Sequence, residues 1–412
     1  MLKHKAKWRI IAAGIIGNVI EYYDFALIGF LATVMGQLFF PSNDPFISIL
    51  GSLGAFAAGM VMRPIGAIFF GHIGDKVNRK YALFGSLAMM AFPTFFIGFL
   101  PTYAQVGILA PILLVILRMI QGFSVGGEYS SSIVYLIEES PKENQNLYGS
   151  FVSLGAKLGM AIGSAVCTLL LFMYGEQEMV SWAWRVPFLF SIVLTIIGFM
   201  LRKNLESGYE AIESKEIPLF EIMKNYRSLF WYFLIMASAI WIFYYTLFIY
   251  LPLWLETYGG LTKEVASRLN TFSIALGVVL IPLMAMIADK IGSKKVIHIS
   301  FLFTFVLIIP LFWLMSKGDI IMSSVAIFVM TILLCSAQAP IFALCVNAID
   351  KHGYRASFTA LILGIASGIV GGTTPAIMAT LTKITSLFFA PALLIMSAIS
   401  LYFFYAIKNI KF

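Results

Sequence analysis

Apolar stretches of about 20 residues, the length that crosses a bilayer as a helix, recur along the whole 412-residue chain. They leave no room for a separate soluble domain. Hydrophobic residues make up 60% of the chain and charged residues 12%, against about 45–50% and about 25% in soluble domains. The chain is therefore predicted to be an all-α protein embedded in a membrane.

Twelve transmembrane helices account for these apolar stretches, and the even number places both termini on the same side of the membrane. The predicted helices are 8–38, 46–72, 81–100, 106–137, 145–174, 182–202, 228–257, 263–288, 295–315, 320–349, 354–382 and 386–407.

Lysines and arginines indicate which side the termini occupy, because cytoplasmic segments retain them. With the N-terminus inside, most of the 28 basic residues lie in inner segments, and the outer ends carry only Lys263, Arg268, Lys317 and Lys383. This bias predicts cytoplasmic termini. It also explains the net charge of +8 without a nucleic-acid partner.

The longest polar stretch, 204–227, lies near the middle of the chain. It predicts a cytoplasmic linker with a short amphipathic helix on the membrane surface. On this interpretation residues 1–203 form an N-terminal bundle of six helices, and residues 228–412 form a C-terminal bundle of six.

The two halves repeat each other. An Asp-Lys pair follows the second predicted helix at Asp75 and the eighth at Asp289. Three glycines at four-residue spacing begin at Gly155 in the fifth helix and at Gly364 in the eleventh. Parallel repeats of this kind are one of the known plans of secondary transporters, and a glycine stripe permits close helix packing.

Several motifs resemble those of a known transporter family. The loop Gly71-His-Ile-Gly-Asp75-Lys76-Val-Asn78-Arg79-Lys80 resembles the signature of the major facilitator superfamily, with Asn78 where the family usually has glycine. Further segments resemble its metabolite:proton symporter branch, which includes carriers of proline and betaine, 2-oxoglutarate, citrate and shikimate. They are Gly17-Asn18-Val-Ile-Glu21-Tyr22-Tyr23-Asp24-Phe25, Arg63-Pro64-Ile-Gly66, Arg118-Met-Ile-Gln121-Gly122, Gly126-Gly127-Glu128 and Trp184-Arg185-Val-Pro187-Phe188.

The resemblance implies the major facilitator fold, with two pseudo-symmetric six-helix bundles in a bacterial inner membrane. It implies proton-coupled uptake of a small polar metabolite, carboxylate-bearing like an organic acid, amino acid or betaine, by alternating access. The expected partners are the substrate, protons and membrane lipid, with the protein acting as a monomer. The alternative is a proton-coupled exporter or antiporter of a metabolite or drug. The fifth helix lacks the Gly-Pro pair typical of drug antiporters, which favours uptake.

Other classes of membrane protein lack support in the sequence. An ATP-driven pump needs a Gly-x-x-x-x-Gly-Lys-Ser/Thr loop, and the chain has none. The three cysteines lie inside apolar runs and the four histidines are scattered, so we expect no metal site, no cofactor and no enzymatic activity.

Ionisable groups inside a bilayer are costly, and each is a candidate functional group. Glu21 and Asp24 lie three residues apart in the first helix, about 60° apart around its axis. Two nearby carboxylates repel each other when both are charged, so one tends to hold a proton. We therefore assign Glu21, Asp24 and Glu128 to proton coupling. The structural alternatives are an ion pair that holds helices together and, for Glu128, a place in a cytoplasmic gate.

The cations of the N-terminal half are candidates for binding a substrate carboxylate. Arg118 could bind it bidentately, or pair with Glu128 or an acid of the first helix. Lys157 lies on a stripe of hydroxyl residues opposite the glycines of the fifth helix. It could bind substrate together with Arg118, or form a salt bridge with Glu21, Asp24 or Glu128. We place Gln121, Asn18 and Tyr22 in the same substrate-binding set.

In the C-terminal half, the seventh helix carries Trp241, Tyr244 and Tyr245 on one stripe, and Gln338 lies in the tenth helix. Such a stripe is more often packing than a binding site. Because the seventh helix lines the cavity in the resembling family, we add these four residues to the substrate-binding set.

The charged loops between helices are candidates for gating. By the resemblance, Asp75 with Arg79 and Lys80, and Asp289 in the second half, latch neighbouring helices in the outward-open state. The alternative is the ordinary enrichment of charge on the cytoplasmic side.

Overall fold

The computed structural model describes residues 2–43, 45–203, 218–350 and 354–409, and in this part of the chain every regular element is a helix, with no strand. The predicted linker 204–227 lies largely outside the described residues. Only its last ten residues, 218–227, are described, and they include the short helix α8 (Pro218–Asn225).

Contacts divide the chain into two compact units. The first comprises residues 1–139, 151–218 and 352–361, and the second comprises 140–150, 219–351 and 362–412. The boundaries 1–203, 204–227 and 228–412 expected from the sequence stay a prediction.

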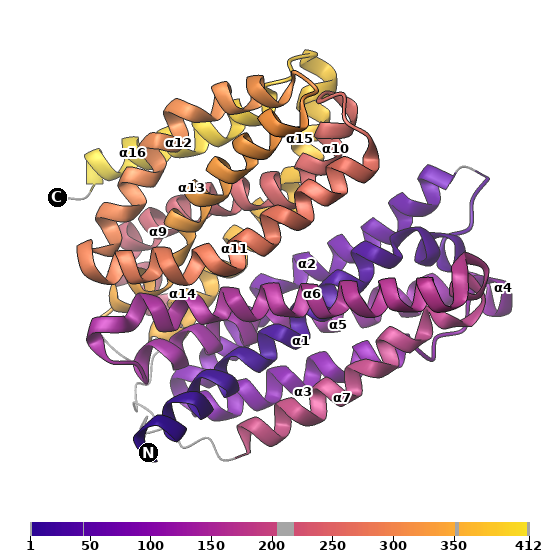
Figure 1. The fold of residues 1–412 in the computed structure, drawn as a ribbon. Helices are drawn as coiled ribbons and strands as arrows, with labels where there is room; N and C mark the ends of the chain where they lie inside the picture. Colours follow the sequence, from indigo (N-terminus) through magenta and orange to yellow (C-terminus); the bar gives the residue numbers. More distant parts are fainter. Residues whose placement is uncertain (1, 44, 204–217, 351–353, 410–412) are drawn as a thin grey trace. The chain divides into compact units, whose positions relative to one another are not determined.

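The first unit is a helix bundle (Figure 1). Its helices are α1 (Leu2–Phe39), α2 (Pro45–Lys76), α3 (Arg79–Ile97), the short α4 (Tyr103–Val106), α5 (Leu109–Glu138), α6 (Gln145–Glu178, from residue 151) and α7 (Arg185–Arg202), with a 3-10 turn at Lys142–Asn144 and a π-helical turn at Met179–Ala183.

The second unit is also a bundle. Its helices are α8, α9 (Arg227–Tyr245), α10 (Leu251–Thr257), α11 (Lys263–Ile291), α12 (Ser293–Met315), α13 (Ile320–Asn347), α14 (Arg355–Leu363, from residue 362), α15 (Gly372–Thr385) and α16 (Ala390–Asn409). A π-helical segment at Thr246–Tyr250 joins α9 to α10, and another at Gly364–Gly371 joins α14 to α15.

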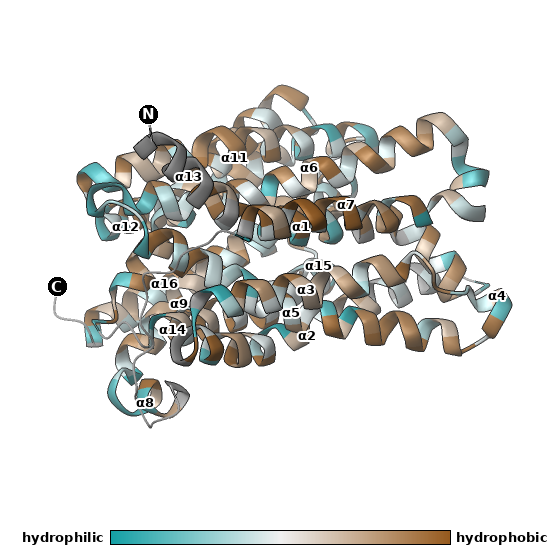
Figure 2. Cartoon of the chain, turned by 90° about the horizontal axis from the view of Figure 1, so that it is seen from below, coloured by the Kyte–Doolittle hydropathy of each residue, from teal (hydrophilic) through white to brown (hydrophobic). Residues whose placement is uncertain are grey.

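The described helices occupy the places of the twelve predicted spans. Among the residues that the structure describes, ten segments are long and apolar enough to cross a membrane; α7 is a shorter apolar helix, and α1 is 38 residues long. Figure 2 shows hydrophobic residues along the helices and hydrophilic residues around the short helices α4 and α8. Two predicted helices, 228–257 and 354–382, each contain a π-helical segment that the sequence pattern did not indicate.

Glycines allow the helices of the first unit to approach backbone to backbone. A Cβ on Gly122 of α5 would overlap the carbonyl oxygen of Gly59 in α2, and one on Gly126 would overlap that of Arg63. In α6, a Cβ on Gly163 would lie 2.9 Å from the carbonyl oxygen of Tyr23 in α1. The packing role predicted for the glycine stripe of α6 is therefore confirmed.

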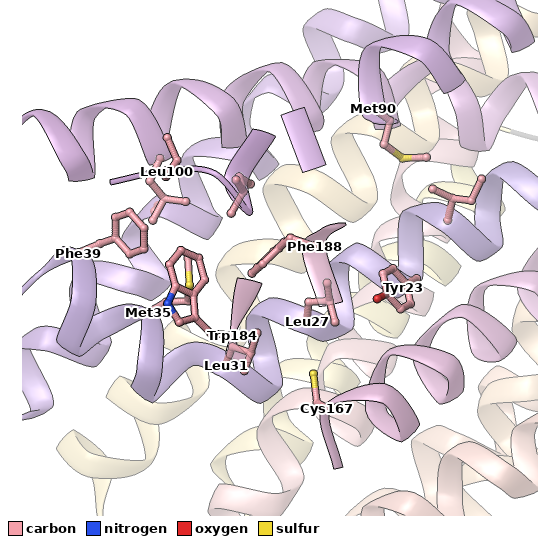
Figure 3. Packing of buried hydrophobic residues seen from close by; sticks show 14 of the residues in the cluster. Tyr23, Leu27, Leu31, Met35, Phe39, Met90, Leu100, Cys167, Trp184 and Phe188 are labelled. Atoms are coloured by element: carbon pink, nitrogen blue, oxygen red, sulfur yellow. The ribbon is translucent and has the colours of Figure 1, made fainter. Parts of the chain in front are cut away.

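An apolar core holds α1 against α7. Tyr23, Phe39, Trp184 and Phe188 are fully buried in it (Figure 3), and the Tyr23 hydroxyl donates a hydrogen bond of 2.6 Å to the carbonyl of Pro187. The Trp184–Phe188 motif thus anchors the start of α7 and fixes one face of α1.

We expect Gly122→Ala to destabilise the first unit by at least about 1–3 kcal/mol, the usual cost of overpacking, because backbone atoms cannot move aside as a flexible side chain does. Thermal unfolding of the purified transporter measures it. Gly54→Ala is the matched control in α2, since no heavy atom of the described neighbours lies within 4 Å of its added Cβ. Equal melting temperatures for both variants would contradict the packing argument.

Candidate functional site

Asp24 of α1 lies in a buried polar cluster with side chains from two other helices. Its Oδ2 accepts a hydrogen bond of 2.9 Å from Arg118 Nη1 and another of 2.9 Å from Gln121 Nε2, both on α5. The Gln121 amide also donates to the Thr94 hydroxyl of α3, at 2.7 Å. Of the partners that the sequence left open for Arg118, the structure selects this acid of the first helix.

Glu21 lies one turn earlier in α1 and has a different environment. Arg63 Nη2 of α2 is 3.5 Å from Glu21 Oε1, and the Glu21 side chain is 1% exposed. Neither carboxylate oxygen accepts a hydrogen bond from the described residues. The Arg63 guanidinium also lies over the Phe25 ring, 5.9 Å from its centre. One acid of α1 is therefore held by close hydrogen bonds and the other by a looser ion pair.

Both acids line one pocket inside the first unit. The polar lining residues are Glu21, Asp24, Arg63, Arg118 and Gln121; the others are Phe25, Phe56, Gly59, Met60, Gly122 and Val125. The pocket thus combines two ion pairs with an aromatic and apolar wall.

Glu128 is fully buried in α5 and is held by hydroxyl groups. Ser86 of α3 donates a hydrogen bond of 2.6 Å to its Oε2, and Ser132 of α5 donates one of 2.9 Å to its Oε1. Ser124 in turn donates to the backbone carbonyl of Ser86. This third buried acid lies between the same two helices, α3 and α5, that Gln121 and Thr94 join.

The remaining substrate candidates of the first unit are buried as well. Lys157 of α6 is 3% exposed. Asn18 donates from its amide to the carbonyl of Gly14 at 3.2 Å, and its Oδ1 has no hydrogen-bond partner among the described residues. Tyr22 packs against the rings of Phe25 and Tyr129.

In the second unit, Trp241, Tyr244, Tyr245 and Phe248 form a continuous buried aromatic stripe. Ring centres lie 5.0 Å apart for Trp241 and Tyr244, and 4.9 Å for Tyr244 and Phe248, each pair edge to face. Gln338 is buried in α13. These ring contacts agree with the alternative that the stripe serves packing within this unit.

The candidate gating residues have different surroundings. Asp289, near the end of α11, accepts hydrogen bonds of 2.9 and 3.0 Å from the backbone N–H groups of Asn146 and Leu147 in the first turn of α6. Its Oδ1 also accepts from the Asn146 side-chain amide, whose oxygen accepts from Ser293. A carboxylate at a helix N-terminus is favourable because it meets unpaired N–H groups and the positive end of the helix dipole.

In the first half, Asn78 stands where the family signature usually has glycine, and the structure gives it a role. It caps α3, with its side chain accepting from the backbone N–H of Lys80 at 2.8 Å. The Lys80 ammonium lies 6.0 Å from the centre of the Phe84 ring. The side chains of Asp75 and Arg79 lie outside the described part of the structure.

Sequence reasoning missed three side chains of the site. Arg63 was seen only as part of a motif, although a basic residue inside a span is itself a signal. Thr94 and Ser86 carried no signal, because hydroxyl residues occur throughout transmembrane helices. Their roles depend on which faces of α3 and α5 meet.

The sequence model of the Major Facilitator Superfamily matches residues 14–375. The chain belongs to the Major Facilitator Superfamily. It is therefore a multi-pass membrane transporter and not an enzyme, as the sequence predicted.

Two curated relatives place the chain near the proline/betaine carriers of this superfamily. It is 30% identical over 404 residues to the "Glycine betaine/proline/ectoine/pipecolic acid transporter OusA" of Dickeya dadantii strain 3937, covering 94% of this chain and 80% of the relative. It is 31% identical over 406 residues to the "Proline/betaine transporter" of Escherichia coli strain K12, with the same coverage. The predicted resemblance to the metabolite:proton symporter branch is confirmed.

Among solved structures, the proton:xylose symporter XylE bound to 6-bromo-6-deoxy-D-glucose has a TM-score of 0.79 at 15% identity, covering 98% of this chain and 96% of that one. At this identity the likeness concerns the fold, and it confirms the predicted major facilitator fold.

We expect Asp289→Ala to speed hydrogen exchange at the first amides of α6, because it removes the acceptor of two N–H groups. Loss of a helix cap costs about 1 kcal/mol, so exchange there should rise about fivefold. Asp319→Ala is the matched control, since Asp319 caps α13 through the N–H of Met322 and should affect α13 alone. Mass-spectrometric exchange of both variants measures this; unchanged exchange in α6 would contradict the capping role.

Proposed function

We propose that this transporter imports a small, carboxylate-bearing metabolite together with protons, by alternating access across a bacterial inner membrane. The relatives named above are described as transporters of proline, betaine, ectoine and pipecolic acid, and the fold neighbour is described as a proton symporter. Each of these solutes carries a carboxylate. In this proposal the chain acts as a monomer with both termini in the cytoplasm, and its partners are the substrate, protons and membrane lipid.

The observation that carries the proposal is the buried contact between Asp24 and Arg118. A buried ion pair is stable only while both charges are present, and removal of one charge leaves the other uncompensated. Protonation of Asp24 would therefore release Arg118 to bind an anion. A proton on Asp24 and a substrate carboxylate on Arg118 would then be bound at the same time, because the binding of each breaks the contact between Asp24 and Arg118. Glu21 and Glu128 complete the proposed set of proton-coupling acids.

We assign the carboxylate of the substrate to Arg118 and Lys157. Both are buried cations of the first unit, and Arg118 Nη2 has no hydrogen-bond partner among the described residues. Arginine offers a planar fork for a carboxylate, and lysine offers a point charge. Gln121, Asn18 and Tyr22 complete this side of the proposed site. Trp241, Tyr244, Tyr245 and Gln338 are its proposed members in the second unit.

We assign gating to the charged helix ends. Asp289 supports this role through its hydrogen bonds to the start of α6, since a cap that forms and breaks can bias a helix between two positions. By the repeat in the sequence, Asp75 with Arg79 and Lys80 has the corresponding role in the first half.

Asp75→Asn should slow transport and shift the conformational equilibrium, which distance labels on the two faces would report.

We expect proteoliposomes with an imposed inward proton gradient to accumulate labelled proline, and a protonophore to abolish the accumulation. Asp24→Asn should abolish gradient-driven accumulation, because its side chain cannot change charge. Glu264→Gln is the control, since Glu264 forms an exposed ion pair with Arg268. Undiminished accumulation in Asp24→Asn would remove Asp24 from the proton path. Gradient-driven extrusion would instead indicate the exporter alternative.

We expect Lys157→Ala to weaken binding of a carboxylate substrate by about 2–5 kcal/mol, the usual loss when one partner of a buried charge pair is removed. Lys157→Arg should restore only part of it, because a planar fork does not replace a point charge. Titration calorimetry on the purified variants measures both. An unchanged affinity in Lys157→Ala would leave the carboxylate to Arg118 alone.

A further inference from the structure

The pocket of the first unit presents more unpaired hydrogen-bond acceptors than donors. Among the residues that the structure describes, both oxygens of Glu21, Oδ1 of Asp24 and Oε1 of Gln121 accept no hydrogen bond. Arg118 Nη2 is an unpaired donor on the same lining. All four side chains are at least nine-tenths buried.

Unpaired buried acceptors are costly. Leaving a buried polar group without a partner costs about 1–3 kcal/mol, and more when the group is charged. Native structures pair nearly all such groups, so an orphaned cluster calls for an explanation. Because a carboxylate accepts hydrogen bonds on both oxygens, Glu21 is the strongest acceptor of the cluster. A ligand that supplies a donor would satisfy it.

The wall beside Glu21 specifies what kind of donor fits. Phe25 and Phe56 meet edge to face with ring centres 4.8 Å apart, and Met60 lies on the same lining. Aromatic faces attract cations, and Arg63 already uses the Phe25 ring in this way. A cationic N–H group next to a carboxylate and an aromatic wall satisfies both features. A neutral hydroxyl would satisfy only the acceptors.

We propose that this pocket binds the ammonium end of a compact amino acid that keeps at least one N–H, with Glu21 as the acceptor. The inference rests on the proposed function, because the carboxylate of the same molecule is assigned to Arg118. It makes Glu21 a specificity-determining residue. A fully methylated ammonium keeps its charge and its attraction to the rings, but it donates no hydrogen bond and leaves both oxygens of Glu21 without one.

This mode of selection discriminates strongly. A site built to hydrogen-bond an N–H group rejects an analogue that lacks it, because its own buried groups are then left unpaired. The extra methyl group must also occupy the place of the donor. The pocket therefore separates N–H-bearing solutes from betaines of similar size and equal charge.

The test is a series of three ligands with one ring and one carboxylate: proline, N-methylproline and N,N-dimethylproline. Binding to the purified full-length transporter is measured by titration calorimetry. Proline and N-methylproline should bind with similar affinity, and N,N-dimethylproline should bind at least about tenfold more weakly. Equal affinity along the series, tighter binding of the dimethyl compound, or no binding of any member would overturn the proposal.

The variant Glu21→Gln should weaken proline about tenfold or more and bring the three affinities together, while Glu264→Gln keeps the wild-type order. If Glu21→Gln keeps that order, Glu21 does not accept a hydrogen bond from the ligand and the proposal falls. The ligand series on the unmodified protein decides the question even if the variant does not fold. Proton-driven uptake of a nitrogen-free carboxylate with no binding of the series would overturn this inference and leave the proposed function intact.

Discussion

Two carboxylates on one turn of a transmembrane helix can stay buried in their charged form only if cations reach them, and this requirement governs the first unit. Arg63 comes from α2 and Arg118 from α5, so both helices must lie close to α1 and to each other. The glycines make that approach possible. Gly59 and Gly122 bring α2 and α5 into backbone contact, and Gly126 packs on the carbonyl of Arg63 itself. The residues that set the helix spacing are thus neighbours of the residues that carry the charges.

The two ion pairs have unequal surroundings, and the inequality follows from the helix faces. Asp24 meets α5 where Arg118 and Gln121 lie one turn apart, so one oxygen receives two donors. Glu21 faces α2, where the neighbours of Arg63 are glycine, methionine and aromatic residues that offer no hydrogen bond. One acid therefore has its counter-charge held rigidly. The other keeps a counter-charge nearby and its lone pairs directed into the pocket.

Composition and periodicity were enough to predict the class of fold, because bilayer thickness imposes apolar runs that no other class needs. The packing role of the glycine stripe of α6 was also predictable, because a four-residue spacing defines one face of a helix whatever its partner is. The motifs also led to Asp24, Arg118 and Gln121 as site residues. The structure added that they belong to one hydrogen-bonded cluster.

The pairing itself could not be predicted. Arg118 had three acids within plausible reach in the sequence, and the choice among them depends on how α1 crosses α5. Thr94 and Ser86 enter the site only through that crossing. The π-helical segments at Thr246–Tyr250 and Gly364–Gly371 depend on local packing, and the hydrophobic pattern continues through both. Asn78 looked like a departure from a motif, yet it supplies the cap of α3.

When the buried acceptors of a pocket lack hydrogen bonds, folding has already borne part of the cost of binding before any ligand arrives. Glu21 is buried in the folded protein, and the first unit has already borne the cost of burying it. A ligand that donates to it gains the hydrogen bond without removing water from the protein side, whereas a ligand that cannot donate leaves the cost in place. Affinity and selectivity then arise from the same atoms. The two acids differ in the same respect: the hydrogen bonds of Asp24 are made within the protein and would break when Asp24 is protonated. The oxygens of Glu21 have Arg63 3.5 Å away but accept no hydrogen bond from the described residues, so a ligand can supply one.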